Sequence, residues 1–369
     1  MSGLAANAGA SMDDLRNGGH VAFVGAGAIG CYVGGRMALA GIDVTLIDPW
    51  GEHVDTIRRD GVTLSGTQGE ANVRVHALHV HEVQRLIEKP IDVAFVTVKS
   101  YDTEWSTLLV RDYLATSGFA VSLQNGINEE RIARHLGWGR TLGCIASTIG
   151  VSLVGPGHAV RHYQPGGASY TIFRVGEVHG RITPRARAVA AMLRTVDSSE
   201  VTSDLWGERW AKVTANSMHN GLAAITGLTH LGIYSRREPR RVAIHLGAEA
   251  ARVGRALGYN VAAIRDIPVD MLEEAARGDE QAFAATEERM QGWTVRMTEE
   301  GRPSTAQDVI KGRRTEIDAI NGLVVESARD ARIDVPYQRA LLDLVKRVER
   351  RTLAAGPENL ELLQRSAAP

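Results

Sequence analysis

The sequence is poor in cysteine and carries no excess of charge of either sign. Its 369 residues include only two cysteines, Cys31 and Cys144, which are too few for a disulfide framework and favour a reducing compartment. Because 42 Lys and Arg residues balance 43 Asp and Glu residues, the net charge of −1 gives no general attraction to nucleic acid or to an anionic membrane. No apolar run approaches the roughly 20 residues that span a bilayer, and the first residues contain no hydrophobic signal-peptide core. We therefore expect a soluble, cytoplasmic enzyme.

Several catalytic and metal-binding signatures are also missing. The sequence has no G-x-S-x-G nucleophile motif, no P-loop and no spacing typical of zinc ligands. His76, His79 and His81 follow an H-x-x-H-x-H pattern, in which the last two would share one face of a strand. Without a supporting pattern of carboxylates or cysteines, we interpret them as part of an exposed edge strand rather than a metal site.

The first half of the chain alternates predicted strands and helices. Continuous apolar runs predict strands at 20–24, 43–47, 91–98 and 119–123, and small apolar residues predict a helix at 31–40. Strands without polar alternation are typical of a parallel sheet that is covered on both faces. This half is therefore predicted to be a doubly wound α/β domain.

The second half has almost entirely helical apolar spacing. We expect residues 1–18 to be a flexible tail, with Met12 as an alternative start, followed by an α/β domain at 19–203 and an all-helical domain at 204–369. The polar stretch 198–203 marks the predicted boundary, because a strongly amphipathic helix follows it. The predicted helical segments are 183–196, 204–228, 235–257, 268–298, 304–312, 314–331 and 336–354.

A glycine motif follows the first predicted strand. Gly25, Gly27 and Gly30 form the pattern G-x-G-x-x-G, with Ala28 and Ile29 between the last two. Between a strand and a helix, the first glycine permits a tight turn, the second lets the backbone approach a pyrophosphate, and the third allows close helix packing. The N–H groups and the positive end of the helix dipole then hold the anion. The motif predicts that these five residues bind a nicotinamide or flavin dinucleotide, as in a Rossmann domain.

An acidic residue, Asp48, ends the second predicted strand. A carboxylate at this position can bind the adenosine ribose hydroxyls and would repel a 2′-phosphate, which favours NAD over NADP. Arg58 and Arg59 could offset that repulsion if they folded back toward it. A structural alternative, compatible with the first, is that Asp48 caps a helix starting at Pro49.

The most informative pattern of the second half is a polar stripe on one predicted helix. Lys212, Asn216 and Asn220 are spaced four residues apart, so they share one helix face. Asparagine is a poor helix former, so two in register with a lysine suggest a function. The stripe predicts an ammonium that polarises a carbonyl and amides that orient hydroxyl groups. His219 lies about 100° of helix rotation from Asn220, and we interpret it as a packing residue.

Two further polar positions have ordinary structural interpretations. Ser304 could be a helix N-cap, with Gln307 completing a capping box. Glu316 could be a first-turn carboxylate that follows Thr315. Spacing alone favours these structural roles over a role in binding.

Together these motifs resemble the ketopantoate reductase (2-dehydropantoate 2-reductase) family. The resemblance runs from about residue 20 to residue 350. It implies a Rossmann domain followed by a helical domain, with the active site between them. It also implies reduction of a 2-keto acid with NADPH or NADH, most directly of 2-dehydropantoate to (R)-pantoate in pantothenate biosynthesis. It is carried by the glycine loop, by the polar stripe, and by the segments 98–100, 124–126, 303–308 and 315–322.

The resemblance assigns roles to residues by matching position. It implies that Lys212 is the catalytic lysine, which hydrogen-bonds the keto oxygen and delivers a proton as hydride leaves the nicotinamide. Glu316 would fix this lysine or a substrate hydroxyl. The hydroxyl and carboxylate of the keto acid would be held by Asn216, Asn220 and Ser304. The nicotinamide end of the site would be lined by Lys99 and Asn125.

Two departures from the family leave alternatives open. The family commonly has a basic residue after the second strand and prefers NADP, whereas this chain has Asp48 there. The helical domain also has extra residues around 268–298, which could change the keto acid or serve a homodimer interface. The alternatives are a different 2-keto acid, an opine-type dehydrogenase, and a nicotinamide-nucleotide sensor without catalysis. A pure sensor would have no need of Lys212 as a proton donor.

Overall fold

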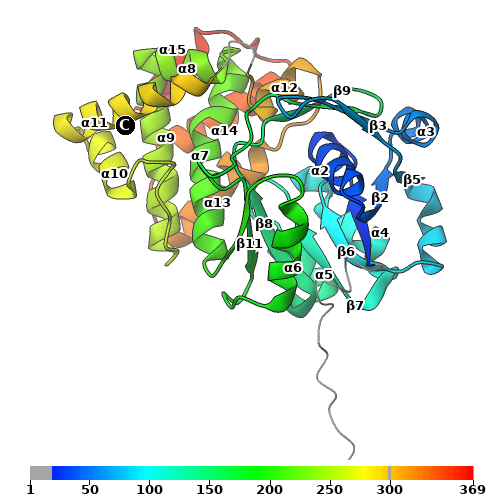
Figure 1. The fold of residues 1–369 in the computed structure, drawn as a ribbon. Coiled ribbons are helices and arrows are strands. Elements are labelled where there is room, and N and C mark those ends of the chain that lie inside the picture. Colours follow the sequence, from blue (N-terminus) through cyan, green and yellow to red (C-terminus); the bar gives the residue numbers. More distant parts are fainter. Residues whose placement is uncertain (1–18, 298–300, 369) are drawn as a thin grey trace, which may run out of the picture. The chain divides into compact units, whose positions relative to one another are not determined.

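The computed structural model describes residues 19–297 and 301–368, and the predicted tail at 1–18 lies outside them. The chain divides between Leu205 and Trp206 into two units. The first unit combines sheets with helices, and the second consists of helices (Figure 1).

The first unit contains an eight-stranded sheet. Its strands are β1 (His20–Val24), β2 (Asp43–Asp48), β5 (His76–His79), β6 (Ile91–Val96), β7 (Leu114–Ser122), β8 (Thr141–Ala146), β11 (Phe173–Glu177) and β12 (Ser199–Thr202). They lie in the order β12-β11-β8-β7-β6-β1-β2-β5. All neighbouring strands pair in parallel except β8 and β11, which are antiparallel. The predicted parallel sheet is therefore confirmed in its central part and becomes mixed toward the β12 edge.

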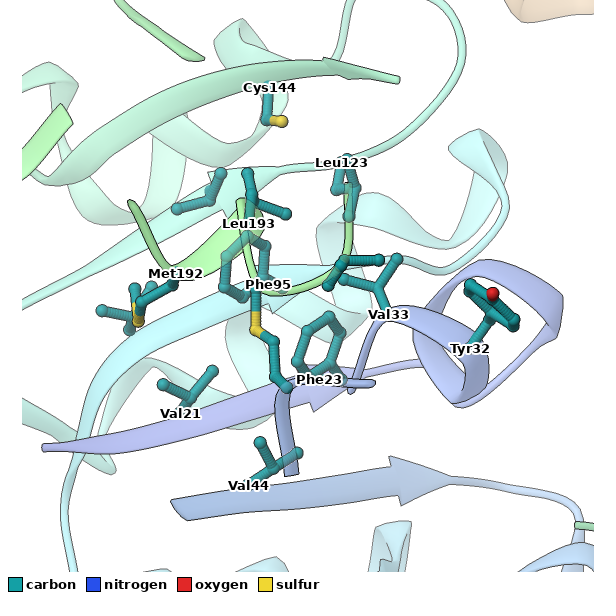
Figure 2. Packing of buried hydrophobic residues seen from close by; sticks show 14 of the residues in the cluster. Val21, Phe23, Tyr32, Val33, Val44, Phe95, Leu123, Cys144, Met192 and Leu193 are labelled. Carbon is teal, nitrogen blue, oxygen red and sulfur yellow. The ribbon is translucent and has the colours of Figure 1, made fainter. Parts of the chain in front are cut away.

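Alternate residues of the central strands serve two different cores, because successive side chains point to opposite faces. On one face Val21 and Phe23 pack with Phe95, whose ring stacks on that of Phe23 at a centroid distance of 4.8 Å (Figure 2). On the other face Ala22 and Val24 belong to a second apolar cluster. Helices α2 and α6 contribute to the first core, and α4 and α5 to the second. The helices of this unit are α2 (Ala28–Leu39), α3 (Gly51–Asp60), α4 (Thr103–Arg111), α5 (Glu129–Leu136) and α6 (Pro184–Leu193).

Several strands of the first unit were not predicted. A four-stranded sheet is formed, in spatial order, by β4 (Ala71–Val73), β3 (Val62–Gly66), β10 (His158–Arg161) and β9 (Val151–Gly155). These strands are short, and β3 pairs with β10 from a distant part of the chain, so no local pattern marks them. Strand β12 occupies the polar stretch that we took for a boundary, because it pairs with β11.

Strand β5 lies at the edge of the large sheet, as its histidines suggested. His79 is 3.1 Å from the Asp55 carboxylate, and its ring stacks on that of His81. In the described part of the chain, no group of His, Cys, Asp and Glu side chains could hold a metal ion. The same part contains no helix that is long and apolar enough to cross a membrane.

The second unit is built around helix α7. Its helices are α7 (Leu205–Thr226), α8 (His230–Ser235), α9 (Arg237–Ala256), α10 (Val269–Arg277), α11 (Glu280–Gly292), α12 (Ser304–Ile310), α13 (Asn321–Ala331), α14 (Pro336–Glu349) and α15 (Asn359–Ala367). Two glycines of α9 allow α7 to approach closely. A Cβ at Gly247 would lie 2.9 Å from Met218, and a Cβ at Gly254 would lie 3.0 Å from Trp210. Helix α7 is thereby held firmly by its apolar side chains.

Three of the predicted helices were wrong in extent. The predicted segment 268–298 is two helices, because Gly278 adopts the left-handed conformation (φ +96°) and Asp279 caps α11 by accepting one of its N–H groups at 2.8 Å. The predicted segment 314–331 becomes α-helical only at Asn321. Helix α14 ends at Glu349, five residues before its predicted end. Helices α8 and α15 were not predicted.

Candidate active site

The glycine loop of the first unit has the geometry that its sequence predicted. Gly25 has φ +96°, and its missing Cβ would lie 2.7 Å from the Val98 side chain. A Cβ at Gly30 would lie 2.1 Å from the Gly25 carbonyl oxygen, so helix and loop can approach only without it. A Cβ at Gly27 would meet nothing within 4 Å. Gly27 therefore leaves open space at the N-terminus of α2, which fits the phosphate of a dinucleotide.

Asp48 is tied to the glycine loop. Its carboxylate accepts a hydrogen bond from the Ala26 N–H at 2.8 Å and another from the Trp50 N–H at 2.9 Å. Helix α3 begins at Gly51 with Trp50 as its N-cap, so Asp48 braces the turn before the helix and does not cap a helix starting at Pro49. That structural alternative was wrong.

His53 holds the same loop from the other side. Its Nδ1 accepts the Gly157 N–H at 2.9 Å, so its Nε2 carries the hydrogen that is donated to the Ala26 carbonyl, also at 2.9 Å. Burial lowers the pKa of His53, which keeps the ring neutral in this role. The loop is therefore braced by two side chains in addition to its own backbone.

Arg58 and Arg59 contact groups other than the Asp48 carboxylate. Arg58 donates to the Ala77 carbonyl and pairs with Glu82. Arg59 pairs with its neighbour Asp60 at 2.7 Å. Since both guanidiniums are engaged elsewhere, neither offsets the charge of the Asp48 carboxylate.

The segments after β6 and β7 are joined by hydrogen bonds. The Ser100 hydroxyl donates to the Asn125 carbonyl at 2.9 Å, and the Gln124 amide donates to the Val98 carbonyl at 2.9 Å. Lys99 and Asn125 are half-buried. Because β1, β2, β6 and β7 are parallel, their carboxyl ends bring Lys99 and Asn125 to the same edge of the sheet as the glycine loop and Asp48. That each of these residues contacts a cofactor remains a prediction.

In the second unit, the polar stripe lies on one uninterrupted helix. Lys212, Asn216 and Asn220 all belong to α7. Each asparagine is only 4% exposed, and Lys212 is half-buried. Within residues 19–297 and 301–368, no hydrogen bond joins the Lys212 ammonium or the Asn220 amide to another group. An ammonium and an amide that have no hydrogen-bond partner among these residues are suited to a polar ligand.

The capping interpretation of Ser304 was wrong. Pro303 is the N-cap of α12, and Ser304 is its first helical residue. The Gln307 amide donates to the Arg302 carbonyl at 3.0 Å, so the two side chains form no capping box. The half-buried Ser304 hydroxyl makes no hydrogen bond to the described residues, which leaves it available to a ligand.

Glu316 is not in the first turn of a long helix either. It is buried, with 5% of its surface exposed, and is the N-cap of the short 3₁₀ turn Ile317–Ala319. Its neighbour Thr315 is held by Glu349, which accepts the Thr315 N–H at 2.8 Å. In the described part of the chain no ion pair joins Glu316 to Lys212. Both roles that the family resemblance implied for Glu316, fixing Lys212 or a substrate hydroxyl, remain predictions.

Lys212 lies among basic groups. Burial, and then the Arg265 guanidinium, lower the pKa of Lys212 to about 8. Burial together with the His230 ring and Arg265 holds the pKa of His219 well below its usual value, and burial and Arg265 lower that of His230 to about 4. His219 Nδ1 lies 2.9 Å from the Tyr234 hydroxyl, in keeping with a packed residue. At neutral pH both histidines are uncharged, whereas Lys212 is still mostly protonated.

No pattern in the sequence indicated the side chains that gather near Lys212. Arg265, Tyr234 and Trp293 come from three separate segments, and the Arg265 guanidinium lies 4.5 Å from the Trp293 ring centroid. No spacing in the sequence relates them to Lys212. The extra length of the helical domain was the one signal that pointed to this region.

These observations first define a class. The first unit has a glycine loop between a strand and a helix of a doubly wound sheet, and the second unit is helical and carries a lysine–asparagine stripe. This combination in one chain is typical of nicotinamide-dependent oxidoreductases. The particular family follows from comparison with known proteins. Ketopantoate reductase PanE/ApbA matches residues 21–172, and its C-terminal counterpart matches residues 204–349. The chain belongs to the ketopantoate reductase family of oxidoreductases.

Individual relatives agree with this family. The chain is 32% identical over 331 residues to the 2-dehydropantoate 2-reductase of Archaeoglobus fulgidus, covering 89% of this chain and 97% of that one. It is 30% identical to the enzyme of the same name from Pyrococcus horikoshii, over 88% of this chain and 96% of that one. A PanE/ApbA family ketopantoate reductase from Ralstonia eutropha JMP134 superposes with a TM-score of 0.72 at 28% identity, covering 90% of this chain and 99% of that one.

A structure with bound cofactor shares the fold. D-mandelate dehydrogenase in complex with NADH and anilino(oxo)acetate gives a TM-score of 0.74 at 21% identity, covering 90% of this chain and 99% of that one. At this identity the likeness concerns the fold alone. The nicotinamide cofactor of this chain is supported by its family.

Proposed function

We propose that this protein reduces a 2-keto acid to a 2-hydroxy acid, and specifically 2-dehydropantoate to (R)-pantoate, the step that serves pantothenate biosynthesis. The observation that carries the proposal is the stripe on α7, where Lys212 and Asn220 have no hydrogen-bond partner among the described residues. The family and the names of the relatives support the same reaction.

Lys212 is the proton donor in this proposal. When bound, a reduced nicotinamide would supply the hydride for the keto carbon, and the carbonyl oxygen would need one proton to become a hydroxyl. The Lys212 ammonium hydrogen-bonds that oxygen, stabilises the negative charge that develops on it, and gives up the proton. A pKa of about 8 suits the task, because the group is protonated at neutral pH and releases its proton more readily than an ordinary lysine.

The remaining polar residues orient the substrate. The two asparagines present amides that can donate to a carboxylate or accept from a hydroxyl, the serine adds a hydroxyl, and Glu316 accepts from a substrate hydroxyl. Lys99 and Asn125 line the nicotinamide end of the site. The substrate-binding residues in this proposal are Asn125, Asn216, Asn220 and Ser304, beside the catalytic residues Lys212 and Glu316.

We propose that residues 19–203 bind the cofactor and residues 204–369 supply the catalytic groups, and that NADH is preferred over NADPH. Among residues 19–297 and 301–368, Asp48 has two backbone N–H partners and no arginine partner, so its charge remains to repel a 2′-phosphate. The cofactor-binding residues would be Gly25, Gly27, Ala28, Ile29, Gly30, Asp48, Lys99 and Asn125.

Steady-state turnover tests the proposal. Purified protein is mixed with 2-dehydropantoate, and loss of absorbance of NADH or NADPH is followed in parallel. Turnover with formation of (R)-pantoate supports the reaction. If a panel of 2-keto acids also gives no turnover, with and without an amino acid co-substrate, the protein is not a reductase of this kind. Tight cofactor binding without turnover would then indicate a sensor, and a requirement for the amino acid would indicate an opine-type dehydrogenase.

The second candidate function is reduction of a different 2-keto acid. It is favoured by the Arg265 guanidinium, which lies on the Trp293 ring. Trp293 belongs to the extra segment of the helical unit, around 268–298, and Arg265 lies just before that segment.

A homodimer in the cytoplasm is part of the proposal as well. A relative from Staphylococcus aureus is described as a dimeric ketopantoate reductase, and both cysteines of this chain are buried free thiols. Light scattering of the purified protein would check the dimer.

A further inference from the structure

A two-residue turn presents Arg265 at its tip. Ile264 and Ile267 exchange N–H···O hydrogen bonds of 2.9 and 3.0 Å, so that only Arg265 and Asp266 lie between them. Arg265 has φ +57°, a conformation that is uncommon for residues other than glycine. Unfavourable backbone conformations of this kind often accompany functional positions.

The turn is held against Trp293, which lies in the extra segment around 268–298. The Asp266 carboxylate accepts the Trp293 indole N–H at 2.6 Å, and the Asp266 carbonyl accepts from Arg289 of α11. The rings of Trp293 and Tyr234 form a T-shaped contact, with centroids 5.3 Å apart. The Arg265 guanidinium then lies over the face of Trp293, at 4.5 Å from its ring centroid. The Trp293 ring and the turn therefore hold the Arg265 guanidinium in one place.

The charge of Arg265 is not compensated by a carboxylate of the described residues. The side chain is exposed, and no carboxylate forms an ion pair with it in the described part of the chain. It is nevertheless close enough to act electrostatically on Lys212, His219 and His230. A cation that is held in position beside another cation, without a counter-charge, is stabilised by an anionic ligand.

We propose that Arg265 is a specificity-determining residue of the active site and binds a carboxylate of the keto acid whose carbonyl is bound by Lys212. Stacking on Trp293 occupies only the face of the guanidinium and leaves its N–H groups free at the edge. That edge matches a carboxylate with two parallel hydrogen bonds. The inference rests on the proposed function, because it assigns a further residue to the same substrate.

The test compares Arg265→Met and Arg265→Lys with Arg277→Met. Methionine keeps the unbranched stem and removes the charge, and lysine keeps the charge without the planar fork. Arg277 is the matched control, because it is an exposed arginine of α10 whose guanidinium lies 3.5 Å from Glu273. Steady-state rates are measured with 2-dehydropantoate, which has one carboxylate, and with 2-ketoglutarate, which has two. Calorimetric titration of the same acids into the protein measures binding without turnover.

For Arg265→Met we expect KM and Kd for the keto acid to rise about tenfold or more, while KM for the nicotinamide and the melting temperature stay unchanged. Arg265→Lys should recover part of the affinity, and Arg277→Met should behave as the unaltered protein. Loss of affinity for both acids assigns Arg265 to the 2-carboxylate, and loss for 2-ketoglutarate alone assigns it to a distal carboxylate. The pH dependence of kcat/KM gives a readout that a merely structural role of Arg265 would not change. Removing Arg265 should move the alkaline limb of this dependence to higher pH.

Two outcomes separate this inference from the proposed function. If the unaltered protein binds the acids but turns none of them over, and Arg265→Met weakens that binding, the inference stands and the reductase function fails. If Arg265→Met retains the affinity of the unaltered protein within about twofold, or if the unaltered protein binds neither acid, the inference is overturned.

Discussion

The Asp48 carboxylate accepts the backbone N–H of Ala26 at 2.8 Å, so the acid that ends β2 and the glycine loop that follows β1 hold each other in place. A residue that the sequence marks as a cofactor contact therefore also shapes the loop. Any substitution of Asp48 must be interpreted with both roles in mind.

Asp48→Asn should relax the preference for NADH. Asparagine keeps one carbonyl acceptor for the backbone but removes the charge that repels a 2′-phosphate. We expect the ratio of kcat/KM for NADH to that for NADPH to fall by about tenfold or more. Asp55→Asn removes a nearby exposed carboxylate of the same unit and should leave the ratio unchanged. An unchanged ratio in Asp48→Asn would show that Asp48 does not select the cofactor.

Gly27→Ala should weaken cofactor binding without unfolding the protein. Gly27 has φ −62°, which alanine adopts freely, and its added Cβ would meet no protein atom within 4 Å. A bound pyrophosphate would occupy that space, so Kd for the dinucleotide should rise about tenfold or more while the melting temperature is retained. Gly139→Ala adds a Cβ in open space elsewhere in the unit and serves as the control. Equal affinities in the two variants would argue against a phosphate at the loop.

The rate of keto acid reduction should fall at alkaline pH, because the Lys212 ammonium loses its proton there. Burial and Arg265 lower its pKa to about 8, so the proton donor is lost as the pH rises through that value. We expect kcat/KM for the keto acid to fall above pH 8 and the reverse oxidation, which needs the neutral amine as base, to increase there. Lys212→Met should reduce kcat by about 10²–10⁴-fold with the fold intact. A reduction rate that stays level well beyond about pH 9 would be incompatible with Lys212 as the donor.

Glu249 should make the second unit less stable as the pH rises. Burial raises its pKa to about 7, although its carboxylate accepts the Tyr337 and Gln338 N–H groups at the start of α14. Because the folded value lies above the unfolded one, the stabilisation is complete below about pH 4.5 and is lost as the pH rises through about 7.

The expected loss is on the order of 3 kcal/mol in the free energy of unfolding, since a difference of one in pKa between the folded and unfolded states corresponds to about 1.4 kcal/mol. Urea unfolding at about pH 5 and about pH 8 would measure it. Glu249→Gln removes the titration and should flatten the dependence. The assignment to Glu249 fails if the glutamine variant loses as much stability over this interval as the unaltered protein.

Sequence patterns predicted those parts of the fold that depend on neighbouring residues. The apolar runs at β1, β2 and β6 were sufficient because a strand buried on both faces needs no polar alternation. The stripe of Lys212, Asn216 and Asn220 followed from helical periodicity. The second sheet was missed because β3 pairs with β10, far along the chain, and short strands carry little local signal.

The sequence by itself determined the family, the glycine loop and the residue types of the α7 stripe, because each rests on spacing within a short segment. Tertiary structure decided what surrounds them. It placed Asp48 against Ala26 and turned Arg58 and Arg59 toward other partners, and it brought Arg265 and Trp293 together within electrostatic reach of Lys212. Contacts of this kind depend on how distant segments pack, and burial and neighbouring charge set the pKa of a lysine only once that packing exists.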